Sequence, residues 1–349
     1  MHIDFLLEVF RANADSDFLV WNGRVFPYSR LLADLDRWQS LLEENGIAAG
    51  TAVAIEADFS PNAIALFLAL MEKGCILIPI TTAIRAKVEE FLETSAAEVL
   101  ITLDSDDNHT LSRTGTAAEN EFYAALRAAG RPGLVLFSSG STGKSKAAVH
   151  DLPKIVDKYR TPRKCLRSIT FLLYDHIGGI NTMFYILSNA GCIVTTPDRS
   201  ADTVLRTVQD FRVELLPTSP TFINLILISE AWKRYDLSSL KIVSYGTEPM
   251  PESTLKRFHG IFPDIRLVQT YGLSEVGILQ SQSKSSDSLW VKIGGDGFET
   301  RVVDNILHIK SRSAMLGYLN APSPFTADGW FITGDLVETD GEYFRILGR

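Results

Sequence analysis

The sequence has few cysteines, no excess of basic residues and no long hydrophobic run, and each shortage excludes a class of protein. Its 349 residues include only three cysteines, Cys75, Cys165 and Cys192. They form no CxxC pair and no disulfide framework, so we expect a reducing, cytoplasmic setting. The longest apolar stretch, residues 63–71, is far shorter than the roughly 20 residues that a membrane span needs. The first residues carry acidic side chains without an apolar run, so we expect no secretory signal.

The charge balance is acidic, with 34 Lys and Arg residues against 42 Asp and Glu residues and a net charge of −8. This balance argues against a broad nucleic-acid or anionic-membrane surface and leaves room for a local basic site that binds phosphate. A hydrophobic content of 46% and a charged content of 22% are typical of globular proteins with a packed core. We therefore expect no nucleic-acid partner and no membrane span.

Short apolar runs alternate with amphipathic stretches from Thr51 to about Thr270. The apolar runs predict strands at residues 53–56, 75–79, 99–102, 134–137, 168–172, 192–195, 214–217, 242–244 and 266–268. The amphipathic stretches predict helices at residues 61–73, 84–94, 178–188, 201–211, 221–229 and 252–262. This alternation is typical of crossover connections and largely parallel sheets.

The pattern changes after about Lys284, where short strands are interrupted by turn sequences at residues 294–297 and 304–305. Such turns predict hairpins. We expect residues 104–133 to form a loop and a short helix. The predicted fold is α/β, with two αβ lobes with largely parallel sheets (layered αβαβα) at residues 1–165 and 166–285. A small β-barrel-like lobe follows at residues 286–345.

The most distinctive local feature is a loop rich in glycine, hydroxyl and lysine residues directly after the apolar run at 134–137. It reads Ser138-Ser139-Gly140-Ser141-Thr142-Gly143-Lys144-Ser145-Lys146. Glycines let the backbone approach an anion, while hydroxyls, N–H groups and lysines donate to phosphate oxygens. We interpret the loop as a phosphate site, the alternative being an ordinary polar connection.

Two other nucleotide-binding motifs do not fit the sequence. Ser138 stands where the GxxxxGK[ST] motif requires its first glycine, and residues 147–149 resemble a strand rather than the helix that should follow. The dinucleotide fingerprint fails at Gly295-Asp296-Gly297, because Thr300 stands at the third glycine position and no helix begins there.

Five segments, in order along the chain, resemble the adenylate-forming superfamily of acyl-CoA synthetases, peptide-synthetase adenylation domains and luciferases. The loop is similar to that family's [ST]SG[ST]TGxPKG, with Ser145 in place of proline and Ala147 in place of the last glycine. The other segments are Tyr245-Gly246-Thr247-Glu248-Pro249-Met250, Gln269-Thr270-Tyr271-Gly272-Leu273-Ser274-Glu275, Met315-Leu316-Gly317-Tyr318-Leu319-Asn320 and Gly329-Trp330-Phe331-Ile332-Thr333-Gly334-Asp335-Leu336.

The resemblance implies ATP-dependent activation of a carboxylic acid to an acyl-adenylate, with release of pyrophosphate. It further implies Mg²⁺ as cofactor and transfer of the acyl group to a thiol, either CoA or the phosphopantetheine of a carrier protein. It also implies that residues 346–349 begin the family's hinge and that the small C-terminal domain is absent. We therefore expect this chain to be weakly active or inactive, and the alternative is a nucleotide-binding module that has lost turnover.

The resemblance also implies a role for each motif residue. The β- and γ-phosphates would be held by Ser138, Ser139, Gly140, Ser141, Thr142, Gly143, Lys144 and Lys146. Adenine and ribose would contact Gly246, Thr247, Glu248, Pro249, Gln269, Thr270, Tyr271, Gly272, Asp335 and Arg349. Glu275 would bind Mg²⁺, and Ser274 would hydrogen-bond the α-phosphate.

Three of these residues also have ordinary structural interpretations. Glu275 could be a carboxylate at a helix N-terminus, Tyr271 could be half-buried packing, and Asp335 could be a turn residue.

The acyl pocket would include Asp175, His176, Gly179 and Leu273, and two alignments remain open there. If residues 176–179 correspond to the HxGG of acyl-CoA synthetases, His176 lies near the substrate carboxylate. If Tyr174-Asp175 corresponds to the Phe-Asp of amino-acid-activating domains, Asp175 pairs with a substrate ammonium. A purely structural alternative is that Asp175 and His176 cap a helix beginning near Gly178.

Overall fold

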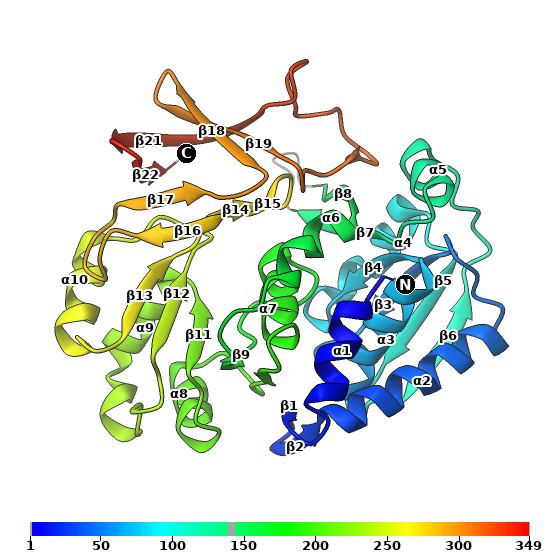
Figure 1. Cartoon of the computed structure of the whole chain (residues 1–349), viewed down its shortest axis with the longest axis horizontal. Helices are drawn as coiled ribbons and strands as arrows, with labels where there is room; N and C mark the ends of the chain where they lie inside the picture. The colour runs from blue at the N-terminus through cyan, green and yellow to red at the C-terminus, as the bar shows by residue number, and fades with distance from the viewer. Residues whose placement is uncertain (1, 139–143, 349) are drawn as a thin grey trace. The chain divides into compact units, whose positions relative to one another are not determined.

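A computed structural model of the chain describes residues 2–138 and 144–348, and it divides into two compact units (Figure 1). Unit 1 comprises Met1–Cys165, Leu173–Cys192 and Met315–Ser323. Unit 2 comprises Leu166–Leu172, Ile193–Ala314 and Pro324–Arg349. Each unit has its own buried apolar cluster.

Unit 1 contains a mixed sheet whose strand order is β20-β8-β7-β4-β3-β5-β6. Its central strands β7, β4, β3 and β5 run parallel, while β8, β20 and β6 are added antiparallel. The strands are β3 (Ala52–Glu56), β4 (Ile76–Ile80), β5 (Val99–Leu103), β6 (His109–Arg113), β7 (Gly133–Ser138), β8 (Lys146–Asp151) and β20 (Gly317–Tyr318). β3 and β4 are buried along their whole length, as expected for central parallel strands.

The helices of unit 1 begin and end at recognisable local signals. In α3 (Pro61–Lys73), the Ser60 hydroxyl accepts from the Ala63 N–H, Pro61 occupies the first turn, and Gly74 ends the helix at φ 79°. The other elements of the unit are α1 (Asp4–Ala12), β1 (Asp17–Trp21), β2 (Arg24–Pro27), α2 (Tyr28–Glu44), η1 (Thr82–Lys87), α4 (Val88–Ser95), α5 (Glu121–Ala128), α6 (Leu152–Val156), η2 (Asp157–Arg160) and α7 (Ile177–Leu187). Within the described ranges, no helix has the length and apolar character needed to cross a membrane.

Unit 2 contains a parallel sheet with the order β13-β12-β11-β9 and β10 beside β9. The strands are β9 (Arg167–Ile169), β10 (Cys192–Val194), β11 (Leu215–Thr218), β12 (Ile242–Tyr245) and β13 (Arg266–Gln269), and the helices between them are α8 (Ala201–Asp210), α9 (Pro220–Ser229), η3 (Ala231–Arg234) and α10 (Glu252–Ile261). In-register pairing places Thr218, Tyr245 and Gln269 side by side where β11, β12 and β13 end.

The remainder of unit 2 is antiparallel. A curled sheet has the order β16-β17-β22-β21-β19-β18, and β14 and β15 form a separate hairpin. The strands are β14 (Gly272–Leu273), β15 (Gly277–Ile278), β16 (Gln280–Ser283), β17 (Val291–Gly294), β18 (Phe298–Val303), β19 (Ile306–Ser311), β21 (Phe331–Asp340) and β22 (Tyr343–Gly348). Asp304 and Asn305 join β18 to β19, both with positive φ, as a type I′ hairpin turn requires.

These elements confirm the predicted α/β fold. Every strand and helix expected between residues 53 and 268 is present within a few residues of its predicted bounds, except that the helix expected at residues 84–94 is divided into η1 and α4. The expectation for residues 104–133 was wrong in one respect, because β6 pairs with β5 there. Its mostly exposed sequence, His109-Thr-Leu-Ser-Arg113, carries no apolar alternation, which is why periodicity missed this edge strand.

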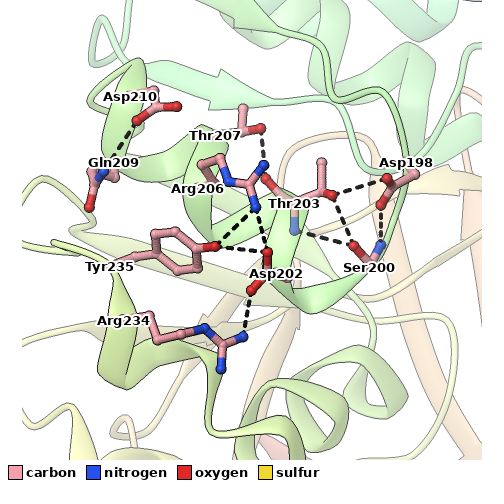
Figure 2. A network of polar contacts seen from close by, with 10 residues as sticks. All are labelled: Asp198, Ser200, Asp202, Thr203, Arg206, Thr207, Gln209, Asp210, Arg234 and Tyr235. Carbon is pink, nitrogen blue, oxygen red and sulfur yellow. Dashed lines mark hydrogen bonds and ion pairs between the residues drawn. The ribbon is translucent and has the colours of Figure 1, made fainter.

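An exposed polar network joins α8 to η3 (Figure 2). The Asp202 carboxylate accepts from Arg206 at 2.7 Å, from Arg234 at 2.5 Å and from the Tyr235 hydroxyl at 2.8 Å. Hydrogen bonds from Arg234 and Tyr235 lower the pKa of Asp202, and they outweigh the opposing effect of desolvation. The network therefore holds η3 against the first turn of α8.

His150 in β8 generates a stability prediction, because it is fully buried and its ring nitrogens lack hydrogen-bond partners among the described residues. Burial lowers its pKa to about 4, whereas the pKa of an unfolded histidine is about 6.5. Between these values only the unfolded chain binds the proton, so stability falls as pH falls through this range. We expect His150→Leu to raise the free energy of unfolding by about 1–2 kcal/mol at pH 7.

The gap between His150→Leu and the parent should widen as pH falls from ~6.5 to ~4, which urea unfolding at several pH values measures. A gap that stays constant with pH would show that His150 does not remain neutral in the folded state.

Candidate active site

The ends of the predicted phosphate loop extend from the β7–β8 ladder of unit 1. Ser138, the last residue of β7, pairs with Lys146, the first residue of β8. Lys144 is exposed, and Lys146 is half-buried with its Nζ 5.3 Å from the centre of the Tyr318 ring. The predicted phosphate residues Ser139, Gly140, Ser141, Thr142 and Gly143, like Arg349 of the predicted ribose set, lie outside the described residues.

Ser145, which replaces the proline of the related loops, makes contacts that a proline could not. Its N–H donates to the Glu90 carboxylate at 3.2 Å, and its hydroxyl accepts from Lys87 Nζ at 3.2 Å. Proline has no N–H and no hydroxyl. Ser145, at the end of the predicted phosphate loop, is therefore hydrogen-bonded to η1 and α4.

In unit 2 the segment Tyr271–Glu275 leaves β13 and enters the β14–β15 hairpin. Ser274 and Glu275 lie in the turn of this hairpin, so the alternative that Glu275 begins a helix is wrong. The turn is anchored by the Val276 carbonyl, which accepts from the hydroxyls of Ser311 at 2.9 Å and Ser313 at 3.1 Å. The two polar side chains are thus placed on a short, fixed turn.

Tyr271 and Asp335 meet in a buried hydrogen bond. The Tyr271 hydroxyl donates to the Asp335 carboxylate, and both residues are less than 10% exposed. Asp335 lies within β21, so the alternative that it is a turn residue is wrong. Its backbone N–H donates at 3.0 Å to the Thr333 hydroxyl, which itself donates to the Leu307 carbonyl at 2.7 Å. Of the residues that the sequence assigned to adenine and ribose, the structure brings Tyr271 and Asp335 into contact.

Three serine hydroxyls satisfy the outer edge of β13 and its continuation. The N–H groups of Leu267, Gln269 and Tyr271 donate to the hydroxyls of Ser286 at 3.2 Å, Ser283 at 2.8 Å and Ser281 at 3.2 Å, respectively. These serines border a shallow pocket of about 440 Å³. Sequence reasoning missed them, and the serine-rich run at residues 281–286 was the available signal.

Gln269 and Thr218 carry the most isolated polar atoms of this sheet. Gln269 Oε1 and Thr218 Oγ1 are buried and have no hydrogen-bond partner among the described residues. They flank Tyr245. Burial raises the pKa of the Tyr245 hydroxyl above its ordinary value. Buried unpaired acceptors are costly, and the carboxyl ends of parallel strands are where α/β proteins bind ligands.

The loop after β12 adopts a strained turn. Thr247 has φ 73°, and a Cβ on Gly246 would lie 2.9 Å from the Thr270 carbonyl oxygen, so only glycine fits there. The Glu248 carboxylate accepts from the Thr221 N–H at 2.8 Å at the start of α9. Desolvation raises the pKa of Glu248, but the hydrogen bonds from Thr221 and Ser219 outweigh it, so the pKa lies below its usual range. The side chain of Glu248 therefore caps a helix.

Asp175, His176 and Gly179 lie together at the start of α7 in unit 1, whereas Leu273 belongs to β14 of unit 2. His176 Nδ1 accepts from the Gly178 N–H at 3.0 Å, so the capping alternative is correct for His176. Asp175 accepts from the Thr81 hydroxyl at 2.7 Å. Desolvation raises the pKa of Asp175, and the hydrogen bond from Thr81 opposes that shift.

Among the described residues, no group of three or more His, Cys, Asp and Glu side chains is arranged to hold a metal ion. Glu275, on its hairpin turn, offers a single carboxylate. Mg²⁺ is commonly bound by one or two carboxylates together with the phosphates of a substrate. The donor set therefore fits a metal that binds with a nucleotide.

Comparison with known proteins identifies the family. The sequence profile of the AMP-binding enzymes matches residues 7–318. The chain belongs to this family. Among curated relatives, an indoleacetate–CoA ligase of Aromatoleum aromaticum is 24% identical over 93% of this chain and 74% of its own length. The 4-coumarate–CoA ligase-like 9 of Arabidopsis thaliana is 27% identical over 68% of this chain and 47% of its own.

Two solved structures with the same fold are complexes with small molecules. The anthranilate–CoA ligase AuaEII in complex with anthranoyl-AMP has a TM-score of 0.82 at 18% identity, covering 100% of this chain and 77% of the other. The N-terminal subdomain of Klebsiella oxytoca NpsA, in complex with 3-hydroxyanthranilyl-AMSN, has a TM-score of 0.79 at 19% identity over 99% of both chains. They confirm the fold of this AMP-binding enzyme.

The hairpin that carries Ser274 and Glu275 generates a steric prediction. A Cβ on Gly272 would lie 2.7 Å from the Gly277 carbonyl oxygen and 2.8 Å from Ile278 Cα. Because these are backbone atoms, we expect Gly272→Ala to lower the free energy of unfolding by about 1–3 kcal/mol. Chemical denaturation measures the change.

The matched control for Gly272→Ala is Gly260→Ala in α10, where an added Cβ meets nothing within 4 Å. In a helix this change should raise stability by about 0.5–1 kcal/mol. Equal effects of the two substitutions would show that the hairpin backbone adjusts.

Proposed function

We propose that this AMP-binding enzyme activates a carboxylic acid with ATP, forming an acyl-adenylate and releasing pyrophosphate. The observation that carries the proposal is the buried contact between Tyr271 and Asp335, which joins two sequence motifs at one place in unit 2. Its relatives are acid–CoA ligases, in keeping with the same chemistry.

In this proposal Tyr271 and Asp335 bind the nucleoside. The Tyr271 ring packs against adenine, and the Asp335 carboxylate accepts from ribose hydroxyls. The Tyr271 hydroxyl fixes the carboxylate in place, so Asp335 is ordered before the ribose arrives. Gly246, Thr247, Pro249 and the backbone of Glu248 border the base, and Gln269, Thr270, Gly272 and Arg349 complete the set.

In this proposal the β- and γ-phosphates are bound by the loop from Ser138 to Lys146, which includes Lys144. Ammonium groups and hydroxyls donate charge-assisted hydrogen bonds to phosphate oxygens. Ser274 donates to the α-phosphate, and Glu275 holds the Mg²⁺ that, when bound, offsets negative charge on the phosphates. The short anchored turn keeps both side chains in position for the attack on phosphorus.

The acid binds near Asp175 and His176 at the start of α7, with Gly179 and Leu273 in the acyl pocket. A neutral His176 whose Nδ1 accepts from Gly178 has its other ring nitrogen protonated, which suits a hydrogen bond to a carboxylate.

The ligase names of the relatives favour aromatic acids such as indoleacetate and 4-coumarate as substrates. The thiol of CoA, or of the phosphopantetheine of a carrier protein, then accepts the acyl group and AMP is released. The low cysteine content supports a cytoplasmic location.

The nucleoside assignment predicts that Asp335→Asn weakens AMP binding about tenfold, because a charge-assisted hydrogen bond to ribose is lost. Isothermal titration calorimetry with AMP measures this. Asp296→Asn is the matched control, since Asp296 is exposed and belongs to the same unit. Equal AMP affinity for Asp335→Asn and the parent would refute the role of Asp335.

The phosphate and metal assignments predict that Lys144→Ala and Glu275→Gln each weaken ATP binding in the presence of Mg²⁺ by about 1.5–3 kcal/mol. AMP affinity should change little in Lys144→Ala, because AMP lacks the β- and γ-phosphates. Lys164→Ala, which removes another exposed lysine of unit 1, is the control. ATP affinity unaffected by both changes would refute the assignments.

Pyrophosphate exchange with a panel of aromatic, fatty and amino acids separates the enzyme from a binding module. Exchange that depends on one acid supports activation. ATP binding without acid-dependent exchange, both in this chain and in a version that carries the family's small C-terminal domain, supports the nucleotide-binding module.

A further inference from the structure

The strand that leaves the predicted phosphate loop is paired along its edge by the Met315–Ser323 segment of unit 1. Leu316 N–H donates to the Val149 carbonyl at 2.7 Å, and Leu319 N–H donates to the Ala147 carbonyl at 2.9 Å. β20 is only two residues long, so its backbone pairing does not reach the start of β8 at Lys146.

The side chain of Asn320 continues this pairing toward the loop. Its Oδ1 accepts from the Ala147 N–H at 3.0 Å, and its Nδ2 donates to the Ser145 carbonyl at 2.8 Å. One carbonyl and one N–H on a planar amide reproduce the pairing groups of a peptide unit. Asn320 thus acts as an additional residue of the neighbouring strand.

The two partners of Asn320 lie on either side of Lys146. The backbone of Lys146 is therefore held before and after its Cα, and its ammonium lies 5.3 Å from the ring centre of Tyr318, in the same short segment. Ser145 is 4% exposed and is held from a different direction by Glu90 and Lys87. A lysine on so constrained a backbone has fewer positions available to its ammonium group.

We propose that Asn320 is a positioning residue for Lys146. It sets the register of the loop exit, and thereby the reach of the Lys146 ammonium toward the β- and γ-phosphates, without itself touching the nucleotide. The proposal rests on the proposed function, because it requires Lys146 to bind ATP. An asparagine suits this position, since its planar amide places one acceptor and one donor on either side of Lys146.

The test is calorimetric binding of ATP with Mg²⁺, and of AMP, to the full chain and to Asn320→Ala. We expect ATP affinity to fall about tenfold and AMP affinity to stay within about twofold, because AMP lacks the phosphates that Lys146 binds. Asn45→Ala is the matched control, since it removes another asparagine hydrogen bond of unit 1, from Nδ2 to the Leu41 carbonyl. If Asn320→Ala does not fold, Asn320→Ser is measured in the same way.

A double-mutant cycle with Lys146→Ala distinguishes positioning from general destabilisation. If Asn320 acts through Lys146, Asn320→Ala lowers ATP affinity in the parent and has little further effect in Lys146→Ala. Additive losses, equal losses of ATP and AMP affinity, or an unchanged ATP affinity in Asn320→Ala overturn the inference alone. If the unaltered chain binds neither nucleotide, the proposed function fails, and this inference fails with it.

Discussion

The hydrogen bond from the Tyr271 hydroxyl to the Asp335 carboxylate is the constraint on which the arrangement of unit 2 depends. It joins residues 64 positions apart, one leaving the parallel sheet and one inside the antiparallel sheet. A buried carboxylate needs a donor, and a buried phenol needs an acceptor, so each group makes the burial of the other acceptable. Tyr271 belongs to an apolar cluster that also includes Val276 and Val337.

At two other places a side chain hydrogen-bonds to a strand where backbone pairing is missing. Serine hydroxyls satisfy the free edge of β13, and the Asn320 amide extends the pairing of β8. In both places a side chain substitutes for a missing backbone partner beside a motif residue. This keeps short strands in register where pairing by the backbone alone would end.

Elements with start, stop or periodicity signals in their own sequence could be predicted, and elements without such signals could not. The helix at Pro61–Lys73 was readable because Ser60, Pro61 and Gly74 are local start and stop signals. β6 was missed because an edge strand with mostly exposed residues lacks apolar alternation. From sequence alone Glu275 could begin a helix, since a tyrosine-glycine sequence suits both turns and helix starts, and the β14–β15 hairpin shows that it lies in a turn.

The sequence by itself determined the α/β order of elements and the family, and it predicts where a phosphate loop lies, because periodicity and motifs are local features of the chain. Only the tertiary structure decided that Tyr271 meets Asp335, that Glu248 caps α9 and that Asn320 spans Lys146. Each of these contacts joins residues distant in the chain. Their geometry depends on how sheets and loops pack, which no short window of sequence encodes.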